Sequence, residues 1–527
     1  MWLSFLLLLA FTVLGCSVNM AGAGKADKGS TAADKTNTDN MLRFSISYPT
    51  TIASGYPSRV DLQNEKWIKK QEELFNVYMD TRVVEDVKMG HMFAGGSLPD
   101  VVGAIGTPSN PSMSGSVEAG LFQPLTQLLK EHVPDLYHYV PEAAWDAVTL
   151  NGEIYGLPGF LSNPSRRATF IRMDLLKKTG KEVPRTIEEF VDVLRAFKTI
   201  GVQHPYAMRE NFKYADIVLG AFDVLPYRDQ FTVIDGEVVP KFFQTDKMMQ
   251  ALQTLKDMYD EGLIAKDFAT LTASDFFNNI ESGNAAIWSQ NAVALTGFSN
   301  NIRQVEPAAE VRIIPSPIGP DGEGGYFYYS PVVTSFYINK NVEEERVIAI
   351  LKFFEWQALS EEAQLFYTFG VEGETYAVND DGSIDYYGAP KTRSGWQEES
   401  WRSGVLWAVR DMTMNRLLYE TTEDGRQIMQ AFDSILQHEG RGGIGFYPEL
   451  ETITAYPELA FPQQDVGPSF IIDNMVQMVY GARPIADWPK VLEEYRARGG
   501  DEIIQEATTR YFNEEGTIHL QEQRLRP

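Results

Sequence analysis

The sequence predicts an α/β protein folded as two or more lobes. Three observations support this: the length of the chain, its apolar content, and an alternation of strand-like and helix-like segments. The chain has 527 residues, which is more than one ordinary domain holds. Hydrophobic residues make up 44% of the chain and aromatic residues 12%, which is enough for apolar cores. After residue 41, strand-like and helix-like patterns alternate. Such alternation is typical of a parallel sheet with helices on its faces.

Periodicity places the individual elements. Alternating or short apolar runs predict strands, and apolar stripes at helical spacing predict helices. Thr186 and Glu189 form the S/T-x-x-E pattern of a capping box at the start of one helix. The predicted strands are 42–50, 76–84, a short buried strand between Asp100 and Gly106, 283–291 and 327–340. The predicted helices are 64–79, 183–200, 245–262 and 343–359, with a mainly helical tail from 391 that is clearest at 474–481 and 488–500.

The N-terminal segment resembles the lipobox of bacterial lipoproteins. Residues 2–14 are an uncharged apolar run, shorter than the ~20 residues of a membrane-spanning helix but suited to a secretory signal. Cys16, the single cysteine of the chain, follows it directly. The resemblance implies a signal peptide over 1–15, a diacylglycerol on the Cys16 thiol and a flexible tether over 16–40. The alternative is a plain signal peptide with an incidental cysteine.

Composition excludes several classes of protein. A net charge of −26 argues against a nucleic-acid surface, which needs a positive face. The sequence "GRGGIG" at 440–445 follows a helix-like stretch and precedes no helix, so we expect a loop rather than a nucleotide site. The six histidines form no H-x-x-x-H pair, which argues against a catalytic zinc site. The G-x-S-x-G nucleophile elbow of α/β-hydrolases does not occur either.

The order of motifs along the chain resembles a known family. The motifs are "GSLPDVV" (96–102), "GLFQPLTQLL" (120–129), "NGEIYGLPG" (151–159), "FIRMDLLKKTGKEVPRTIEEF" (170–190), "LKDMYDEGLIAKDF" (255–268), "ESGNAAIW" (281–288), "IGPDGEGG" (318–325) and "FGVEGETY" (369–376). Together they are similar to the extracellular solute-binding proteins (family 1) of ABC importers. The similarity is strongest to the large lipoprotein subgroup of Gram-positive bacteria linked to oligosaccharide uptake.

The resemblance implies a two-lobed, periplasmic-binding-protein-like fold of type II, with a hinge that the chain crosses several times. The N-terminal lobe would hold 41–167 plus 315–390, and the C-terminal lobe 168–314 plus 391–527. The ligand would lie in the cleft between them, and closure of the lobes would present a surface to the permease.

Strand ends suggest the first candidate ligand contacts. In open α/β sheets, ligands bind beyond the carboxyl ends of strands. Tyr48 ends the first predicted strand, Thr107 and Ser109 follow the third, and Trp288 ends "NAAIW". Trp288 is the strongest candidate, because an aromatic face for stacking stands beside the hydrogen-bonding sequence Ser-Gln-Asn. The alternative is that Trp288 belongs to a core.

Two further segments supply candidates. In "SGWQEESWRSGVLW" (394–407), the resemblance implies a stacking tryptophan, and Trp401 with Trp396 is favoured, with Glu398 as a polar neighbour. Asn163 and Arg166 lie in the predicted hinge stretch "SNPSRRATF" and would reach sugar hydroxyls.

A calcium site is a weaker expectation. Some relatives hold calcium in a loop equivalent to "KKTGKEVPRTIEE", and here only Glu188 and Glu189 match its oxygen ligands. Because Glu189 is explained by helix capping, we expect no metal and no other cofactor.

The expected function is capture of an oligosaccharide by a monomer that is lipid-anchored at the extracellular face of the cell membrane. The ligand would pass to an ABC permease, without catalysis and without nucleic-acid binding. Three alternatives stay open at this point. They are an anchored carbohydrate-active enzyme (a glycosidase or lyase), a binder of a non-sugar solute, and a structural surface lipoprotein.

Overall fold

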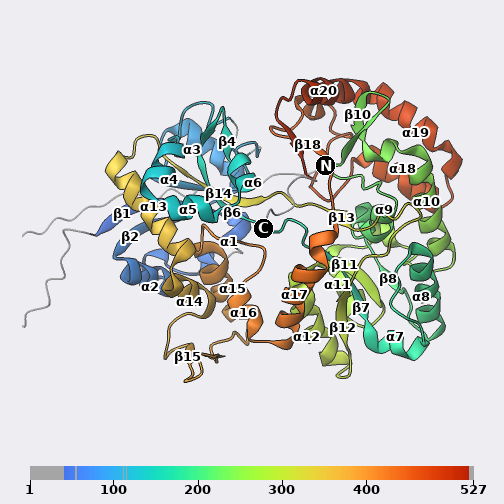
Figure 1. The fold of residues 1–527 in the computed structure, drawn as a ribbon, viewed down its shortest axis with the longest axis horizontal. Coiled ribbons are helices and arrows are strands. Elements are labelled where there is room, and N and C mark those ends of the chain that lie inside the picture. Colours follow the sequence, from blue (N-terminus) through green and yellow to red (C-terminus); the bar gives the residue numbers. More distant parts are fainter. Residues whose placement is uncertain (1–40, 54–55, 111, 114, 521–527) are drawn as a thin grey trace, which may run out of the picture. The chain divides into compact units, whose positions relative to one another are not determined.

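The structure, a computed structural model, describes residues 41–53, 56–110, 112–113 and 115–520. The predicted signal peptide and the lipidation site at Cys16 lie outside the described residues. The described residues from Leu42 onward form one compact unit, whose elements are shown in Figure 1. Two sheets organise this unit, and each is the centre of one lobe.

The first lobe is built on a five-stranded sheet. Its order is β2-β1-β3-β14-β6; β1 runs parallel to β2 and β3, and β14 runs antiparallel to β3 and β6. The strands are β1 (Leu42–Pro49), β2 (Val77–Val84), β3 (Val101–Ile105), β6 (Gly156–Phe160) and β14 (Val332–Ile338). The helices are α1 (Thr50–Ala53), α2 (Lys66–Phe75), α3 (Met89–Gly95), α4 (Thr126–His132), α5 (Pro134–Tyr139), α6 (Glu142–Asp146), α13 (Glu344–Leu359), α14 (Glu361–Phe369) and α15 (Arg393–Ser400). Two small hairpins belong to the same stretches of chain, β4 (Thr149–Leu150) with β5 (Glu153–Ile154) and β15 (Tyr376–Val378) with β16 (Ile384–Tyr386).

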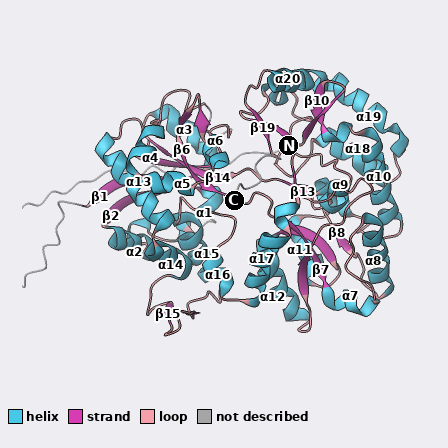
Figure 2. Cartoon of the chain, viewed as in Figure 1, coloured by secondary structure: helices cyan, strands magenta, loops and turns pink. Residues whose placement is uncertain are grey.

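The second lobe is built on a four-stranded sheet of order β12-β7-β11-β8, and Figure 2 shows helices on both sides of its strands. The strands are β7 (Arg167–Arg172), β8 (Tyr206–Ala207), β11 (Ile287–Asn291) and β12 (Val311–Ile314). A second four-stranded sheet holds β9 (Phe231–Ile234), β10 (Glu237–Pro240), β18 (Ile444–Phe446) and β19 (Thr517–His519), and β13 (Tyr326–Phe327) pairs with β17 (Gly440–Arg441). The helices are α7 (Met173–Thr179), α8 (Ile187–Thr199), α9 (Asp216–Ala221), α10 (Thr245–Asp260), α11 (Ala273–Glu281), α12 (Leu295–Val305), α16 (Arg416–Glu420), α17 (Glu423–Ser434), α18 (Ser469–Val479), α19 (Trp488–Tyr495) and α20 (Asp501–Phe512).

Both central sheets are covered on two faces, because side chains alternate along each strand. In β14, Phe336 enters one apolar core of the first lobe and Tyr337 enters the other. In β11, Ile287 enters one core of the second lobe and Trp288 the other. Each lobe is therefore a three-layer α/β unit, as the sequence predicts. The sheets themselves are mixed rather than parallel, because β14 runs antiparallel to its neighbours in the first lobe and β7 does so in the second.

The capping box predicted at Thr186 is present. The Thr186 hydroxyl accepts from the backbone N–H of Glu189, and the Glu189 carboxylate accepts from the N–H of Thr186. The helix behind it, α8, ends at Thr199, one residue before the predicted end.

Three short segments connect the lobes: 161–166, 328–331 and 410–415. They lie side by side, since the N–H of Tyr329 donates to the Pro164 carbonyl at 3.0 Å and the N–H of Met412 donates to the Phe160 carbonyl at 2.6 Å. These are the crossing segments referred to below.

Two predicted lobe boundaries lie too early in the chain. Tyr326 and Phe327 pack in a core of the second lobe, so the chain returns to the first lobe after them rather than at 315. Trp401, Leu406 and Val409 pack in a core of the first lobe, so the last crossing follows them rather than residue 390.

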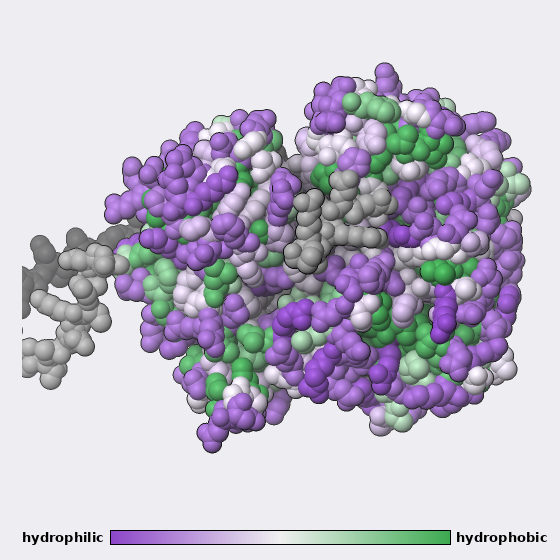
Figure 3. All heavy atoms as spheres, viewed as in Figure 1, coloured by the Kyte–Doolittle hydropathy of each residue, from purple (hydrophilic) through white to green (hydrophobic). Residues whose placement is uncertain are grey.

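The face drawn in Figure 3 is mostly hydrophilic, with hydrophobic residues in scattered groups. In the part of the chain that the structure describes, no helix combines the length and the apolar character needed to cross a membrane.

Candidate functional site

A cavity of about 640 Å³ is lined by residues of both lobes and of two crossing segments; it is called the cleft below. β3 ends at Ile105, and the chain then turns at Gly106, whose φ of +69° suits glycine. This turn brings Thr107 and Ser109 to the wall of the cleft. The cleft therefore lies beyond the carboxyl end of a strand, where ligands of α/β sheets bind.

The second lobe contributes charged and aromatic side chains to the cleft. Arg228 forms an ion pair with Glu449. Asp229 is only 9% exposed, and burial raises the pKa of its carboxyl to about 7. Burial likewise raises the pKa of Tyr447. Around neutral pH this wall therefore carries one compensated ion pair and a partly protonated acid.

The first crossing segment contributes Arg166. The guanidinium carbon of Arg166 lies 5.8 Å from the centre of the Tyr329 ring, and Tyr329 lines the cleft as well. The Nε atom of Arg166 is buried and has no hydrogen-bond partner among the described residues. Burial lowers the pKa of this guanidinium. An arginine placed in this way has donors to offer to a ligand.

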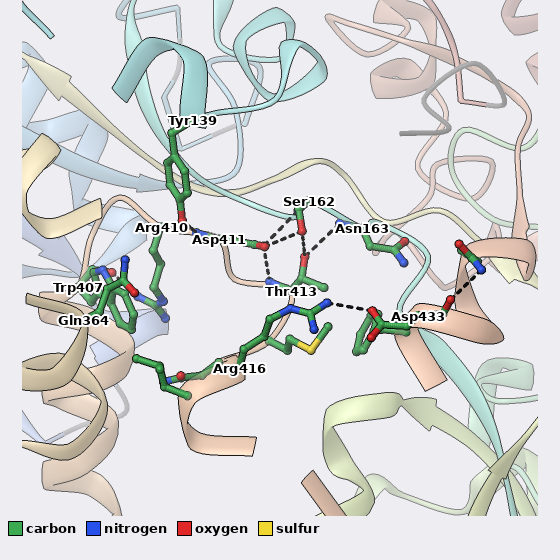
Figure 4. Close-up of a pocket in the computed structure, with 15 residues that line it drawn as sticks. Tyr139, Ser162, Asn163, Gln364, Trp407, Arg410, Asp411, Thr413, Arg416 and Asp433 are labelled. Atoms are coloured by element: carbon green, nitrogen blue, oxygen red, sulfur yellow. Dashed lines mark hydrogen bonds and ion pairs between the residues drawn. The ribbon is translucent and has the colours of Figure 1, made fainter. Parts of the chain in front are cut away.

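A second cavity, of about 470 Å³, is the hinge pocket, and it shares no lining residue with the cleft. Figure 4 shows Asp411 at its centre. Asp411 accepts from the N–H of Ser162 at 3.1 Å, from the Ser162 hydroxyl at 2.5 Å and from the N–H of Thr413 at 2.9 Å. These bonds connect two crossing segments. The polar groups of the hinge pocket therefore have partners within the chain and need no ligand to explain them.

The structure gathers four of the residues predicted from the sequence around these two cavities. Thr107, Ser109 and Arg166 line the cleft. Asn163 lines the hinge pocket, where its N–H donates to the Thr413 hydroxyl at 3.1 Å. Thr107, Ser109 and Arg166 can therefore contact one ligand in the cleft. Asn163 does not line the cleft.

Trp288 belongs to a core, which corrects the expectation that its ring faces a cleft. β11 runs on to Asn291, so Trp288 is the second residue of the strand and not its end. Its side chain is 0% exposed, and its ring stacks on Phe170 with centroids 5.7 Å apart. An indole in this position offers no free face to a sugar.

Tyr48 and Trp401 are corrected in the same way. Tyr48 is 0% exposed and Trp401 is 1% exposed, and their rings meet edge to face at 5.8 Å in the core of the first lobe. Trp396 is 59% exposed on α15, and Glu398 pairs with Lys66. Neither of these two residues lines the cleft or the hinge pocket.

Several cleft residues are missing from the sequence prediction. Arg228, Asp229, Tyr447 and Glu449 lie in loops, far apart in the sequence, and carry no recognisable motif. "GRGGIG" was expected to be a loop, but Gly440–Arg441 and Ile444–Phe446 form the short strands β17 and β18. Tyr447 follows β18 directly. Recognition of this strand in the sequence would therefore have placed Tyr447 at a strand end, where ligand contacts were sought.

The carboxylates named for calcium have other surroundings. Glu189 accepts from the backbone N–H groups of Arg185 and Thr186 as a helix cap. In the described ranges, no three His, Cys, Asp or Glu side chains come together as a metal site.

Comparison with known proteins gives the family. The sequence model of the bacterial extracellular solute-binding proteins matches residues 82–364, more than half of the chain. The chain belongs to this family, and the protein is an extracellular solute-binding protein.

Relatives with names agree with this assignment. Lipoprotein LipO of Bacillus subtilis (strain 168) is 25% identical over 440 residues, which cover 80% of this chain and 83% of that protein. The polygalacturonan/rhamnogalacturonan-binding protein YtcQ of the same strain is 23% identical over 516 residues, or 95% of this chain and 97% of that protein.

Solved structures show the same two-lobed fold. The alginate-binding protein AlgQ2, solved without calcium ion, superposes with a TM-score of 0.62 at 20% identity and covers 91% of this chain and 100% of its own. The S. pneumoniae substrate-binding protein FusA in complex with kestose gives 0.63 at 15% identity, over 90% and 99% of the two chains.

Proposed function

We propose that this protein captures an oligosaccharide in the cleft and delivers it to the permease of an ABC importer. The observation that carries the proposal is the cleft itself. It joins hydroxyl side chains beyond β3, the guanidinium of Arg166 and the tyrosines Tyr329 and Tyr447 in one cavity of about 640 Å³. Hydroxyl, guanidinium and phenol groups suit the many hydroxyls of a glycan, and tyrosine rings can stack on sugar rings. The names of YtcQ and FusA, which refer to saccharides, support the same class of ligand.

Capture in this proposal involves no chemistry and no bound metal. The three crossing segments act as a hinge, and closure of the lobes removes water from the cleft and presents the loaded form to the permease. The protein works as a monomer at the extracellular face of the cell membrane, held by a lipid on Cys16. LipO carries the word lipoprotein in its name, which supports this anchoring.

A carbohydrate-active enzyme is the second candidate, and one observation favours it. Asp229 and Glu449 both line the cleft, and the pKa of Asp229 is raised to about 7. Two carboxyl groups in one cavity, one of them with a raised pKa, is the arrangement that glycosidases use. The family, whose members bind solutes, supports the binding function instead.

A thermal-shift screen of the full-length protein with neutral and acidic oligosaccharides tests the proposal. A ligand that binds only the folded state adds about 2.7 kcal/mol at 100 times its dissociation constant. We expect a clear rise in melting temperature with one glycan, recovered intact afterwards. A cleaved glycan would support the enzyme, and no rise across the panel would overturn the proposed function.

A further inference from the structure

Among the charged side chains of the cleft, Arg166 differs in having no acidic partner. Arg228 is compensated by Glu449 within the same wall. Asp229 carries only part of a negative charge near neutral pH, because burial raises the pKa of its carboxyl to about 7. The guanidinium of Arg166 has no ion pair within the described residues, so the cleft holds an excess of positive charge at this point.

The acids near Arg166 form no ion pair with it, although Asp411 attracts its guanidinium electrostatically. Arg167, the next residue, is fully buried, with Nη1 3.0 Å from Asp216 and Nη2 2.8 Å from Asp465. These two acids are therefore already occupied by another cation. Asp411, the acid of the adjoining crossing segment, accepts hydrogen bonds from Ser162 and Thr413.

The cost of this arrangement points to a ligand. A buried donor without a partner loses its hydration and gains nothing in return. The Nε atom of Arg166 is such a donor, although its side chain lines an open cavity. A bound group that accepts from Nε and its neighbouring Nη would remove this cost. A carboxylate has the geometry for it, because its two oxygens match two parallel N–H donors of a guanidinium.

We propose that Arg166 binds a carboxylate of the captured glycan, so that the cleft selects oligosaccharides that contain uronic acid over neutral ones. This inference rests on the proposed function of the same cleft. Thr107 and Ser109, which line the same cleft, are uncharged and hydrogen-bond hydroxyls of the same ligand. Selection therefore depends on one cation. The other residues of the cleft bind hydroxyl groups, which acidic and neutral sugars share.

Calorimetric titration of the full-length protein tests this inference with two matched glycans. The probes are a short oligogalacturonate and its methyl ester of the same length, which lacks the charges and carries one added methyl group on each carboxyl. Loss of a charge-assisted hydrogen bond weakens binding about ten- to a hundredfold. We expect the acid to bind more tightly than the ester by this factor, and the preference to fall as salt is added.

Variants then assign the preference to Arg166. Arg166→Gln is expected to remove this preference, by weakening binding of the acid more than binding of the ester. Arg166→Lys is expected to keep part of the preference. The double variant Arg228→Gln/Glu449→Gln removes a compensated pair from the same wall, so it is expected to change the affinities for acid and ester by the same factor.

The outcomes separate this inference from the proposed function. Equal affinities of the wild-type protein for acid and ester would overturn the role of Arg166, and so would a preference that survives in Arg166→Gln. Binding of a neutral glycan without binding of the oligogalacturonate would overturn the inference and leave the proposed function standing. Failure of every glycan to bind would overturn both. The comparison of acid and ester needs no variant, so misfolding of Arg166→Gln would not spoil the test.

Discussion

Two adjacent arginines show how the interior of the second lobe differs from the crossing segment that leads into it. Arg167, the first residue of β7, is compensated by Asp216 and Asp465. Arg166, one residue earlier, lines the cleft and has no such partner in the described part of the chain. This difference indicates that a charge buried inside the fold is neutralised by partners within the chain, which the stability of the fold requires. A charge left open in a cavity is available to a ligand.

The largest effect we expect comes from breaking the buried pair. Asp216→Asn leaves Arg167 beside a neutral amide in a place without water, and removal of one partner of a buried ion pair costs about 3–5 kcal/mol. Urea denaturation of the variant and the wild type measures this loss. The control is Asp260→Asn, which breaks the exposed Lys256–Asp260 pair and is expected to cost less than about 0.5 kcal/mol. Similar losses in the two variants would contradict a special role for the buried pair.

Trp288 and Trp396 extend the comparison to two of the three tryptophans that were predicted to bind ligand. Trp288 is 0% exposed and Trp396 is 59% exposed. Truncation of a buried tryptophan costs about 3–5 kcal/mol because a cavity remains, whereas an exposed residue contributes within about 0.5 kcal/mol. We expect Trp288→Ala to lower the free energy of unfolding by the larger amount and Trp396→Ala to leave it nearly unchanged.

Ligand affinity then decides whether Trp288 is purely structural. With the glycan found in the thermal-shift screen, the milder Trp288→Phe variant should bind as the wild type does, since the ring does not reach the cleft. A tenfold loss of affinity in a folded Trp288→Phe protein would restore Trp288 as a ligand contact.

Local patterns predict local structure in this chain. The capping box at Thr186 and the apolar stripe that follows it gave α8 to within one residue of its end. The segment 245–262 likewise became α10, which begins at Thr245. α8 begins at a capping box and the segment of α10 is followed by Gly262 with a φ of +66°, so both helices carry signals in neighbouring residues and no information about the rest of the chain was needed.

The site was predictable only in part, because it depends on contacts between distant segments. Arg228 and Glu449 are 221 residues apart in the sequence, and no local pattern pairs them. Trp401 was assigned to the wrong side of the last crossing, since its packing against Tyr48 is also a long-range contact. Thr107, Ser109 and Arg166 were found because strand ends and a hinge stretch leave a mark in the sequence.

A buried carboxyl of the second lobe provides a smaller effect that depends on pH. Glu439 is 7% exposed and accepts from the N–H of Ser316 at 2.9 Å; burial raises the pKa of its carboxyl from 4.5 to about 7. The folded state therefore binds a proton more tightly than the unfolded state. The free energy of unfolding should fall by about 3 kcal/mol as the pH rises from 4.5 to 7 and then level off.

Glu439→Gln isolates this effect, because glutamine keeps an oxygen acceptor for Ser316 and does not titrate. Urea denaturation at pH 5 and pH 8 should show that the variant gains on the wild type by about 3 kcal/mol between the two conditions. A constant difference between the two proteins would show that Glu439 titrates normally.

The smallest effect on stability is expected at Arg166, and it tests the comparison most directly. Arg166→Gln removes a charge that forms no ion pair, together with a buried donor that has no partner in the described residues, so the free energy of unfolding should stay the same or rise slightly. Arg167→Gln, one residue away, leaves Asp216 buried without its cation and should cost about 3–5 kcal/mol. Urea denaturation without ligand measures both variants. If Arg166→Gln cost as much as Arg167→Gln, the fold itself would be using the charge of Arg166, and that charge would not be free for a ligand. An unchanged or slightly raised stability of Arg166→Gln beside a large loss in Arg167→Gln would mean that the chain keeps a cation in the cleft that its own stability does not require.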